Sequence, residues 1–188
     1  MAYEVEMKAW VDDWPGLEAV IRQRCVFQRA FRKTDRYFRL RSPLRRLVSR
    51  TRFRLRIDDR ATYVTYKDKR LRGSAEINLE REFAVDDTDA FVELASRLGF
   101  AEFYGKVKEG LRFAYDDLVV EISRVEGLGA FLEVEYLDEN SDASVHGLAA
   151  DRISAFIADC GIDPSRIEPR PYQQLLREAR HSRRAHSR

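Results

Sequence analysis

Apolar and polar side chains alternate with a period of two along most of this chain. Successive side chains of a β-strand point to opposite faces of a sheet, so the alternation predicts strands with one apolar and one charged face. Eight segments show this pattern: residues 3–11, 35–41, 51–57, 61–67, 76–84, 104–115, 117–123 and 131–137. A chain built from such segments folds around a β-sheet.

Helical segments separate several of the strands and have recognisable ends. Proline favours the first turn of a helix, Asp, Ser and Thr cap its start, and Gly often follows its end. On these signals we predict helices at 15–29, at 88–98, at about 143–160 and from Pro171 onward. Strands and helices together place the chain in the α+β class.

Two pairs of aspartates mark tight turns between consecutive strands. Asp58-Asp59 lies between the third and fourth segments, and Asp116-Asp117 lies between the sixth and seventh. Aspartate tolerates turn geometry and bonds to its own backbone, so both pairs predict hairpins. Consecutive strands of this sheet should therefore be antiparallel.

Length and composition indicate one compact domain. The 188 residues are 44% apolar and contain no linker-like break, so we place a single domain at 1–176 and expect a frayed basic tail at 177–188. Cys25 and Cys160 lie far apart without metal-type spacing, which is typical of buried thiols in a reducing compartment. With no leader pattern and no apolar run of membrane-spanning length, we expect a cytoplasmic protein without a membrane partner. The choice between monomer and homodimer stays open.

Positive charge is concentrated in one part of the chain. Between Arg29 and Arg72 there are 17 basic and 4 acidic residues, although the whole chain has a formal net charge of only +2. Such a segment could bind nucleic acid, bind a small anion through a cluster of strands, or form a solvated surface. Nucleic-acid binding is the weakest of these interpretations.

Pairs of glutamates recur on the polar faces of three predicted strands. The pairs are Glu4 with Glu6, Glu80 with Glu82, and Glu133 with Glu135. The first pair shares its face with Lys8, and taken alone a strand of this kind is more typical of a solvent-exposed face. Neighbouring glutamates repel each other unless a cation neutralises them, so three pairs in one sheet predict a site for Mg²⁺ or Mn²⁺.

Basic side chains share faces in the same manner on other strands. They are Arg52, Arg54 and Arg56 on one segment, Lys67 on the next, and Lys106, Lys108 and Arg112 further along. The planar fork of arginine and the point charge of lysine both suit phosphate oxygens. Carboxylates that hold a metal beside such cations predict a polyphosphate ligand.

Short motifs that contain these residues follow one another in a recognisable order. They are Glu4–Lys8, Thr34–Phe38, Phe53–Arg56, Thr65–Lys67, Glu80–Glu82, Val125–Glu135 and Pro171–Leu176. In this order the chain resembles the CYTH family, also called triphosphate tunnel metalloenzymes. That family groups class IV adenylyl cyclases, thiamine triphosphatases and inorganic triphosphatases.

The resemblance implies an eight-stranded antiparallel β-barrel, or tunnel, with helices packed on its outside. Glu4, Glu6 and Lys8 would lie at the catalytic centre. The implied metal ligands are Glu4, Glu6, Glu133 and Glu135, with Glu80 and Glu82 as further ligands or orienting groups. The implied phosphate-binding residues are Lys8, Arg54, Arg56, Lys67 and Lys108.

Two positions depart from the family pattern. Gly110 stands where an arginine is usual, and Ser123 stands where an aspartate is usual. Arg112 and Glu121 have the same parity on their strands and are the candidate replacements. One phosphate ligand and one acidic contact are therefore altered.

The function that these features predict is metal-dependent hydrolysis of a small triphosphate compound, which could be tripolyphosphate, thiamine triphosphate or a nucleoside triphosphate. One alternative is a class IV-type adenylyl cyclase that makes cyclic AMP and pyrophosphate. That alternative loses weight because only three residues precede Glu4, where cyclases often carry a His-Phe pair. Another alternative is a module that binds polyphosphate or nucleotide without turnover.

Overall fold

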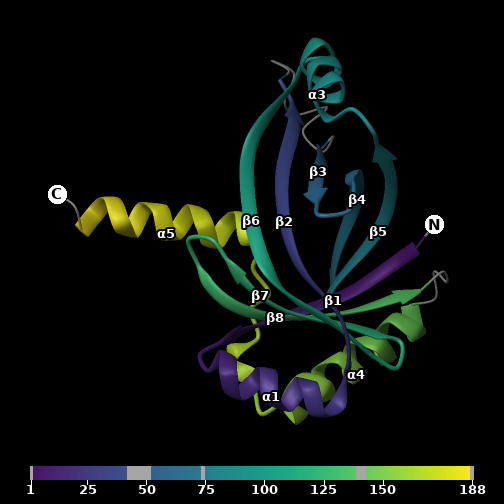
Figure 1. Ribbon diagram of the computed structural model, residues 1–188, viewed down its shortest axis with the longest axis vertical. Helices are drawn as coiled ribbons and strands as arrows, with labels where there is room; N and C mark the ends of the chain where they lie inside the picture. Colours follow the sequence, from purple (N-terminus) through teal and green to yellow (C-terminus); the bar gives the residue numbers. More distant parts are fainter. Residues whose placement is uncertain (1, 42–51, 73–74, 139–142, 187–188) are drawn as a thin grey trace.

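The computed structural model of the protein describes residues 2–41, 52–72, 75–138 and 143–186 (Figure 1). The strands are β1 (Ala2–Val11), β2 (Val26–Leu40), β3 (Arg52–Asp58), β4 (Thr62–Arg72), β5 (Ala75–Val85), β6 (Phe100–Tyr115), β7 (Leu118–Val125) and β8 (Gly129–Asp138). The helices are α1 (Trp14–Arg24), α3 (Thr88–Arg97), α4 (Ala143–Asp159), the short 3₁₀ helix η1 (Pro164–Arg166) and α5 (Tyr172–His186). These elements confirm the predicted α+β class.

All neighbouring strands in the sheet are antiparallel, as the hairpin signals predicted. The strand order is β1-β5-β4-β3-β2-β6-β7-β8, and β1 also pairs with β8, so the order returns to its first strand. One consequence is that β1 and β8, which are far apart in sequence, lie side by side. Their register places Glu6 opposite Glu135 and Lys8 opposite Glu133.

Both aspartate pairs lie at hairpin turns. β3 ends at Asp58 and β4 begins at Thr62, and the backbone N–H of Asp58 donates to the carbonyl oxygen of Ala61 at 3.1 Å. Asp116 separates β6 from β7 and has a φ of 49°. Aspartate adopts this left-handed conformation more readily than most residues, which explains its use at the turn.

The predicted helix at 15–29 is wrong in its second half. Helix α1 ends at Arg24, and Cys25 is already extended with φ −118° and ψ 152°. From Val26 onward the chain pairs with β6, and the ring of Phe27 packs edge-on against Phe113 at 5.5 Å. β-Branched and aromatic side chains favour this pairing, so β2 begins nine residues before the predicted strand at 35–41.

The segment from Arg177 to Arg188, for which we expected a frayed basic tail, is helical as far as the described residues extend. Helix α5 continues through this segment to His186, and it projects away from the rest of the molecule in Figure 1. Its first turns are anchored, because Tyr172, Leu175 and Leu176 are buried. Anchoring at one end lets the helix extend into the segment where composition alone suggested fraying.

The main apolar core lies on the outer face of the sheet. Val5, Met7 and Ala9 alternate along β1 and pack with Ile21 of α1 and Ile153 of α4. Helices α1 and α4 lie next to each other beneath β1 and β8 in Figure 1. They bury the apolar face of these strands, which leaves the other face of the sheet to carry the charged side chains.

Among the described helices, none combines the length and the apolar character needed to cross a membrane.

Candidate functional site

The charged face of the sheet is largely buried, and this separates it from an ordinary solvated surface. The buried polar side chains on it are Glu4, Lys8, Lys33, Asp35, Lys106, Lys108, Glu121, Ser123 and Glu133. Burying a charge is costly unless a partner of opposite charge compensates for it. It therefore matters which of these buried groups form ion pairs with each other and which lie close to groups of the same charge.

Three carboxylates converge where β1 meets β8. Glu4, Glu6 and Glu135 each offer one oxygen, and these oxygens all lie within 4.8 Å of one another. We call these three residues the carboxylate cluster. Burial, and then the charge of Glu4, raise the pKa of Glu135 to about 7. The like charges of the cluster thus oppose each other in the metal-free protein.

The carboxylate cluster suits a hard divalent cation. Mg²⁺ and Mn²⁺ prefer oxygen ligands, and carboxylates from paired strands are held at fixed spacing by the sheet. A cation at this point would also relieve the repulsion that raises the pKa of Glu135. The donor set is therefore compatible with the metal that the sequence predicts.

Glu133 lies on β8 beside the cluster but has a different partner. Its carboxylate accepts a hydrogen bond of 2.6 Å from Lys108 Nζ, and both side chains are buried. Although burial opposes ionisation, Lys108 and Lys106 lower the pKa of Glu133 to about 2. Glu133 is therefore ionised and paired with a lysine, whereas Glu135 lies among other carboxylates.

Glu121 on β7 is the centre of a buried network of ion pairs. It accepts hydrogen bonds from Lys33 Nζ at 2.5 Å, Lys108 Nζ at 2.8 Å and Arg112 Nη1 at 3.0 Å. Burial and repulsion from Lys108 lower the pKa of Lys33 to about 8. Glu121 thus holds three cations together on the charged face.

Asp35 on β2 forms a second buried ion pair. Arg56 donates to both of its carboxylate oxygens, at 2.7 and 3.0 Å, and Lys106 Nζ lies 3.4 Å away. This fork-to-fork geometry fixes the direction of the guanidinium group of Arg56. It turns a flexible side chain into a rigid donor that lies at the edge of a cavity.

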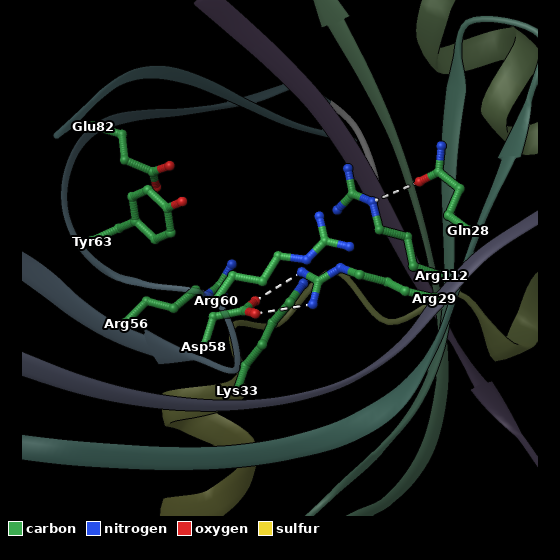
Figure 2. Close-up of a pocket in the computed structure, with 9 residues that line it drawn as sticks. All are labelled: Gln28, Arg29, Lys33, Arg56, Asp58, Arg60, Tyr63, Glu82 and Arg112. Atoms are coloured by element: carbon green, nitrogen blue, oxygen red, sulfur yellow. Dashed lines mark hydrogen bonds and ion pairs between the residues drawn. The ribbon is translucent and has the colours of Figure 1, made fainter. Parts of the chain in front are cut away.

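A cavity of about 670 Å³ opens beside these ion pairs (Figure 2). Its lining is rich in basic groups: Gln28, Arg29, Lys33, Arg56, Asp58, Arg60, Tyr63, Glu82 and Arg112. Figure 2 shows the side chains of Arg29, Arg60 and Arg112 directed into the same space. Five cations against two carboxylates make this cavity suited to an anion.

The other predicted site residues lie outside the carboxylate cluster found among the described residues. Arg54 donates to the Thr65 hydroxyl at 3.0 Å, and that hydroxyl donates to Glu82 at 2.7 Å. Glu82 therefore lies on the cavity wall, outside the carboxylate cluster found among the described residues. Lys67 and Glu80 face each other in the ladder between β4 and β5, but their side chains lie outside the described residues.

Tyr172, at the N-terminal end of α5, contacts two lysines of the charged face. The ring of Tyr172 lies under two ammonium groups, with Lys106 Nζ 4.4 Å and Lys8 Nζ 5.4 Å from its centre. Burial raises the pKa of the Tyr172 hydroxyl well above its usual value, and the carboxylates of Glu133 and Glu6 raise it further. Tyr172 therefore remains a neutral hydrogen-bond donor.

Sequence reasoning missed several basic residues of the cavity, namely Arg29, Lys33 and Arg60. Arg29 and Lys33 lie in the stretch that was assigned to a helix or to no element, so they had no predicted face. Phe31, Lys33 and Asp35 are all buried on one side of β2. Extending the predicted strand from Asp35 toward Val26 would have placed Lys33 on the same face as Asp35, because the two residues are separated by two positions. Arg60 lies in a turn, where alternation gives no guidance.

Comparisons with known proteins agree with this architecture. A family model described as the CYTH domain matches residues 2–151. The PH1012 protein of Pyrococcus horikoshii OT3 is 26% identical and has a TM-score of 0.77, with 92% of this chain and 99% of that one covered. A Hippeastrum protein, provisionally named an adenylyl cyclase and described with a dominant triphosphatase activity, has a TM-score of 0.63 at 14% identity. That match covers 95% of this chain and 96% of the other, and at this identity it shows the fold alone.

A curated relative from Methanocaldococcus jannaschii is provisionally named an adenylate cyclase. It is 32% identical over 84 residues, which is 44% of this chain. The matched part spans 47% of that protein, about half of its length. Because the CYTH model matches most of this chain and the fold agrees, the protein belongs to the CYTH family.

Proposed function

We propose that the protein is a metal-dependent hydrolase of a small triphosphate compound and that it works by in-line phosphoryl transfer within a tunnel formed by the eight strands. The observation that carries this proposal is that the charged face of the sheet holds both the carboxylate cluster of Glu4, Glu6 and Glu135 and a cavity lined by five cations. One of these cations, Lys33, is close enough to Glu135 to favour its ionised form. Phosphoryl transfer asks for little covalent chemistry from a protein. It depends on positioning and on stabilising negative charge, and both are built into this site.

Glu4, Glu6 and Glu135 are the residues that would hold a divalent cation, with Mg²⁺ or Mn²⁺ expected from the oxygen donors. Such a cation supplies Lewis-acid stabilisation of phosphate oxygens. Glu133 and Glu121 would contribute indirectly, because they fix Lys108 at 2.6 and 2.8 Å and so hold its ammonium group in place.

The basic residues would bind and orient the polyphosphate. Arg56 is held by Asp35 and Arg112 by Glu121, so both guanidinium groups are positioned before a ligand arrives. Arg29 is fixed in the same way by Asp58, through two hydrogen bonds of 2.9 Å. Preorganised donors lose little freedom on binding and favour the charge that develops on a transferring phosphoryl group.

The names given to relatives support both a triphosphatase and a cyclase, because each reaction needs a metal and a triphosphate clamp. The decisive experiment incubates purified protein with Mg²⁺ or Mn²⁺ and, separately, with tripolyphosphate, thiamine triphosphate and ATP. Orthophosphate, pyrophosphate and cyclic AMP are then measured. Orthophosphate from at least one substrate is the expected result, whereas cyclic AMP with pyrophosphate would assign the cyclase reaction. Tight binding without any product would leave a binding module.

A further inference from the structure

The basic cavity has two ends of different chemical character. Figure 2 shows Arg29, Arg60 and Arg112 directed into one end, while Tyr63 and Glu82 lie next to each other at the opposite end. The three guanidinium groups suit phosphate oxygens. An aromatic ring beside a carboxylate suits a different kind of group, so the two ends of the cavity favour different parts of one ligand.

Glu82 on β5 gives the second end a negative charge. The other carboxylate of the cavity, Asp58, is neutralised by Arg29 through two hydrogen bonds of 2.9 Å. One oxygen of Glu82 accepts a hydrogen bond of 2.7 Å from the Thr65 hydroxyl, and Arg54 Nη2 lies 3.7 Å from it. The Glu82 side chain is still 43% exposed, so its carboxylate can accept further hydrogen bonds. Its charge repels a phosphate and favours an O–H or N–H donor.

Tyr63 on β4 supplies an aromatic ring next to this carboxylate. The residue is half-buried, and it lines the cavity. The register between β4 and β5 places Ala84 opposite Tyr63, and a methyl group covers little of a tyrosine ring. Glu82 lies two residues before Ala84 and shares its face of the sheet. A ring in this position can stack on a planar group of a ligand.

The size of the cavity also allows a ligand with two parts. Its volume is about 670 Å³. Pockets of about 300–1,000 Å³ commonly hold organic ligands of drug size. The cavity therefore has room for an organic group at Tyr63 and Glu82 in addition to phosphoryl groups at the arginines.

We propose that Tyr63 and Glu82 form a specificity subsite for the organic group of the substrate. The Tyr63 ring stacks on a planar heterocycle, and the Glu82 carboxylate accepts a hydrogen bond from an amino or hydroxyl group of the same compound. The inference rests on the proposed function and narrows the substrate to an organic triphosphate with a heterocyclic group. Inorganic tripolyphosphate would leave this end of the cavity unfilled. Both residues act in binding, and no covalent step is assigned to them.

Tyr63→Leu removes the ring, and Glu82→Gln removes the negative charge while it keeps the shape of the side chain. Tyr66→Leu is the matched control for the first variant, because Tyr66 lies on the same strand with its side chain 46% exposed on the opposite face. Glu93→Gln is the control for the second, since Glu93 forms an exposed ion pair with Arg97 on α3. Affinities for ATP, thiamine triphosphate and tripolyphosphate are measured separately by calorimetry in EDTA, so that turnover does not interfere.

Wild type and both controls should bind ATP, thiamine triphosphate or both about tenfold more tightly than tripolyphosphate, and the preferred compound identifies the organic group. Tyr63→Leu should lose about tenfold in affinity for that compound and keep its affinity for tripolyphosphate. Glu82→Gln should bind the organic compound several-fold more weakly and tripolyphosphate equally or more tightly, because a repelling charge is removed.

Equal wild-type affinities for all three compounds would overturn the subsite. So would a Tyr63→Leu or Glu82→Gln variant that keeps its affinity for the organic compound, or that loses affinity for tripolyphosphate to the same extent. In these cases tripolyphosphate still binds to the wild type, and the proposed function stands. Failure of the wild type to bind any of the three compounds would instead overturn the proposed function together with the subsite.

Discussion

Gly110 and Ser123 lie directly opposite each other in the ladder between β6 and β7. These are the two positions that depart from the family pattern, so the altered residues form one facing pair. A Cβ atom at position 110 would lie 2.1 Å from the carbonyl oxygen of Ile122 and 2.8 Å from the Cβ of Ser123. The glycine is therefore required by the close approach of the two strands.

This close approach predicts that Gly110→Ala destabilises the protein. The added methyl group meets backbone atoms that cannot move without disturbing the ladder, so we expect a loss of about 2 kcal/mol or more in the free energy of unfolding. Denaturant unfolding followed by circular dichroism measures it. Gly105→Ala is the control, because a Cβ there has its nearest contact at 3.6 Å and should change stability by less than about 1 kcal/mol. Equal losses in the two variants would contradict the account.

The centre of the ion-pair network should be highly sensitive to loss of charge. Glu121→Gln leaves Lys33, Lys108 and Arg112 without the buried carboxylate that all three contact. Breaking one side of a buried network of this kind costs about 3–5 kcal/mol. Chemical denaturation should show such a loss.

The matched control for this substitution is Glu93→Gln, which removes an exposed ion pair with Arg97. Exposed pairs contribute little, so the control should lose less than about 1 kcal/mol. If Glu121→Gln is no less stable than Glu93→Gln, the buried network does not hold the charged face together.

The carboxylate cluster predicts a specific pH dependence in the metal-free protein. The pKa of Glu135 is raised to about 7 in the folded state, above its ordinary value of 4.5, so folding takes up a proton between these two pH values. Stability from this group is therefore present at low pH and is lost as the pH rises toward and through 7, by roughly 3 kcal/mol in total. Glu135→Gln should remove this loss and be more stable than wild type at pH 8 in EDTA.

Melting temperatures between pH 4.5 and 8.5, with EDTA and then with Mn²⁺, check the prediction. Added Mn²⁺ should stabilise wild type more at pH 8 than at pH 5, because the ion competes with the proton for the cluster. The control Glu102→Gln alters an exposed carboxylate paired with Arg36 and should follow the wild-type profile. A Glu135→Gln profile parallel to that of wild type would contradict the assigned cluster.

Lys33 gives the basic cavity a pH dependence of its own. Burial and the nearby charge of Lys108 lower its pKa to about 8, so its ammonium group loses a proton as the pH rises from 7 to 9. The cavity then has one positive charge fewer, and the affinity for tripolyphosphate should fall by several-fold over this range. Calorimetric titrations at pH 7, 8 and 9 measure the change, and Lys33→Met should bind more weakly at pH 7 with a flatter profile. A wild-type affinity that does not decline would contradict this assignment.

Much of the fold follows from the sequence, because side-chain alternation reports strands that bury one face. The eight strands were predicted on that basis, and the two turns were predicted from the turn-forming chemistry of aspartate. The start of β2 was not predicted. Pro15 and the charged residues after it suit a helix, and nothing in the local sequence marks the end of helix α1 at Arg24. Only pairing with β6, 70 or more residues away, makes Val26 and Phe27 part of a strand.

The sequence indicated which glutamates were candidate metal ligands, but it did not indicate which of them come together in the structure. Six glutamates were candidate ligands, and the structure brings Glu4, Glu6 and Glu135 together while Glu133 pairs with Lys108. Adjacent residues on one strand face, such as Glu133 and Glu135, are equivalent in sequence. The register against β1, which places Lys8 opposite Glu133 and Glu6 opposite Glu135, is what distinguishes them. Register depends on the whole ladder and is not encoded in either motif alone.

The central claim, that the carboxylate cluster supports hydrolysis of a triphosphate, is tested most directly by release of orthophosphate from tripolyphosphate as Mg²⁺ or Mn²⁺ is titrated into wild type, Glu6→Gln and Glu102→Gln. We predict that wild type and Glu102→Gln release orthophosphate only with the metal present, and that Glu6→Gln loses at least a hundredfold in rate. Metal-independent release by wild type, or equal rates for Glu6→Gln and wild type, would contradict it.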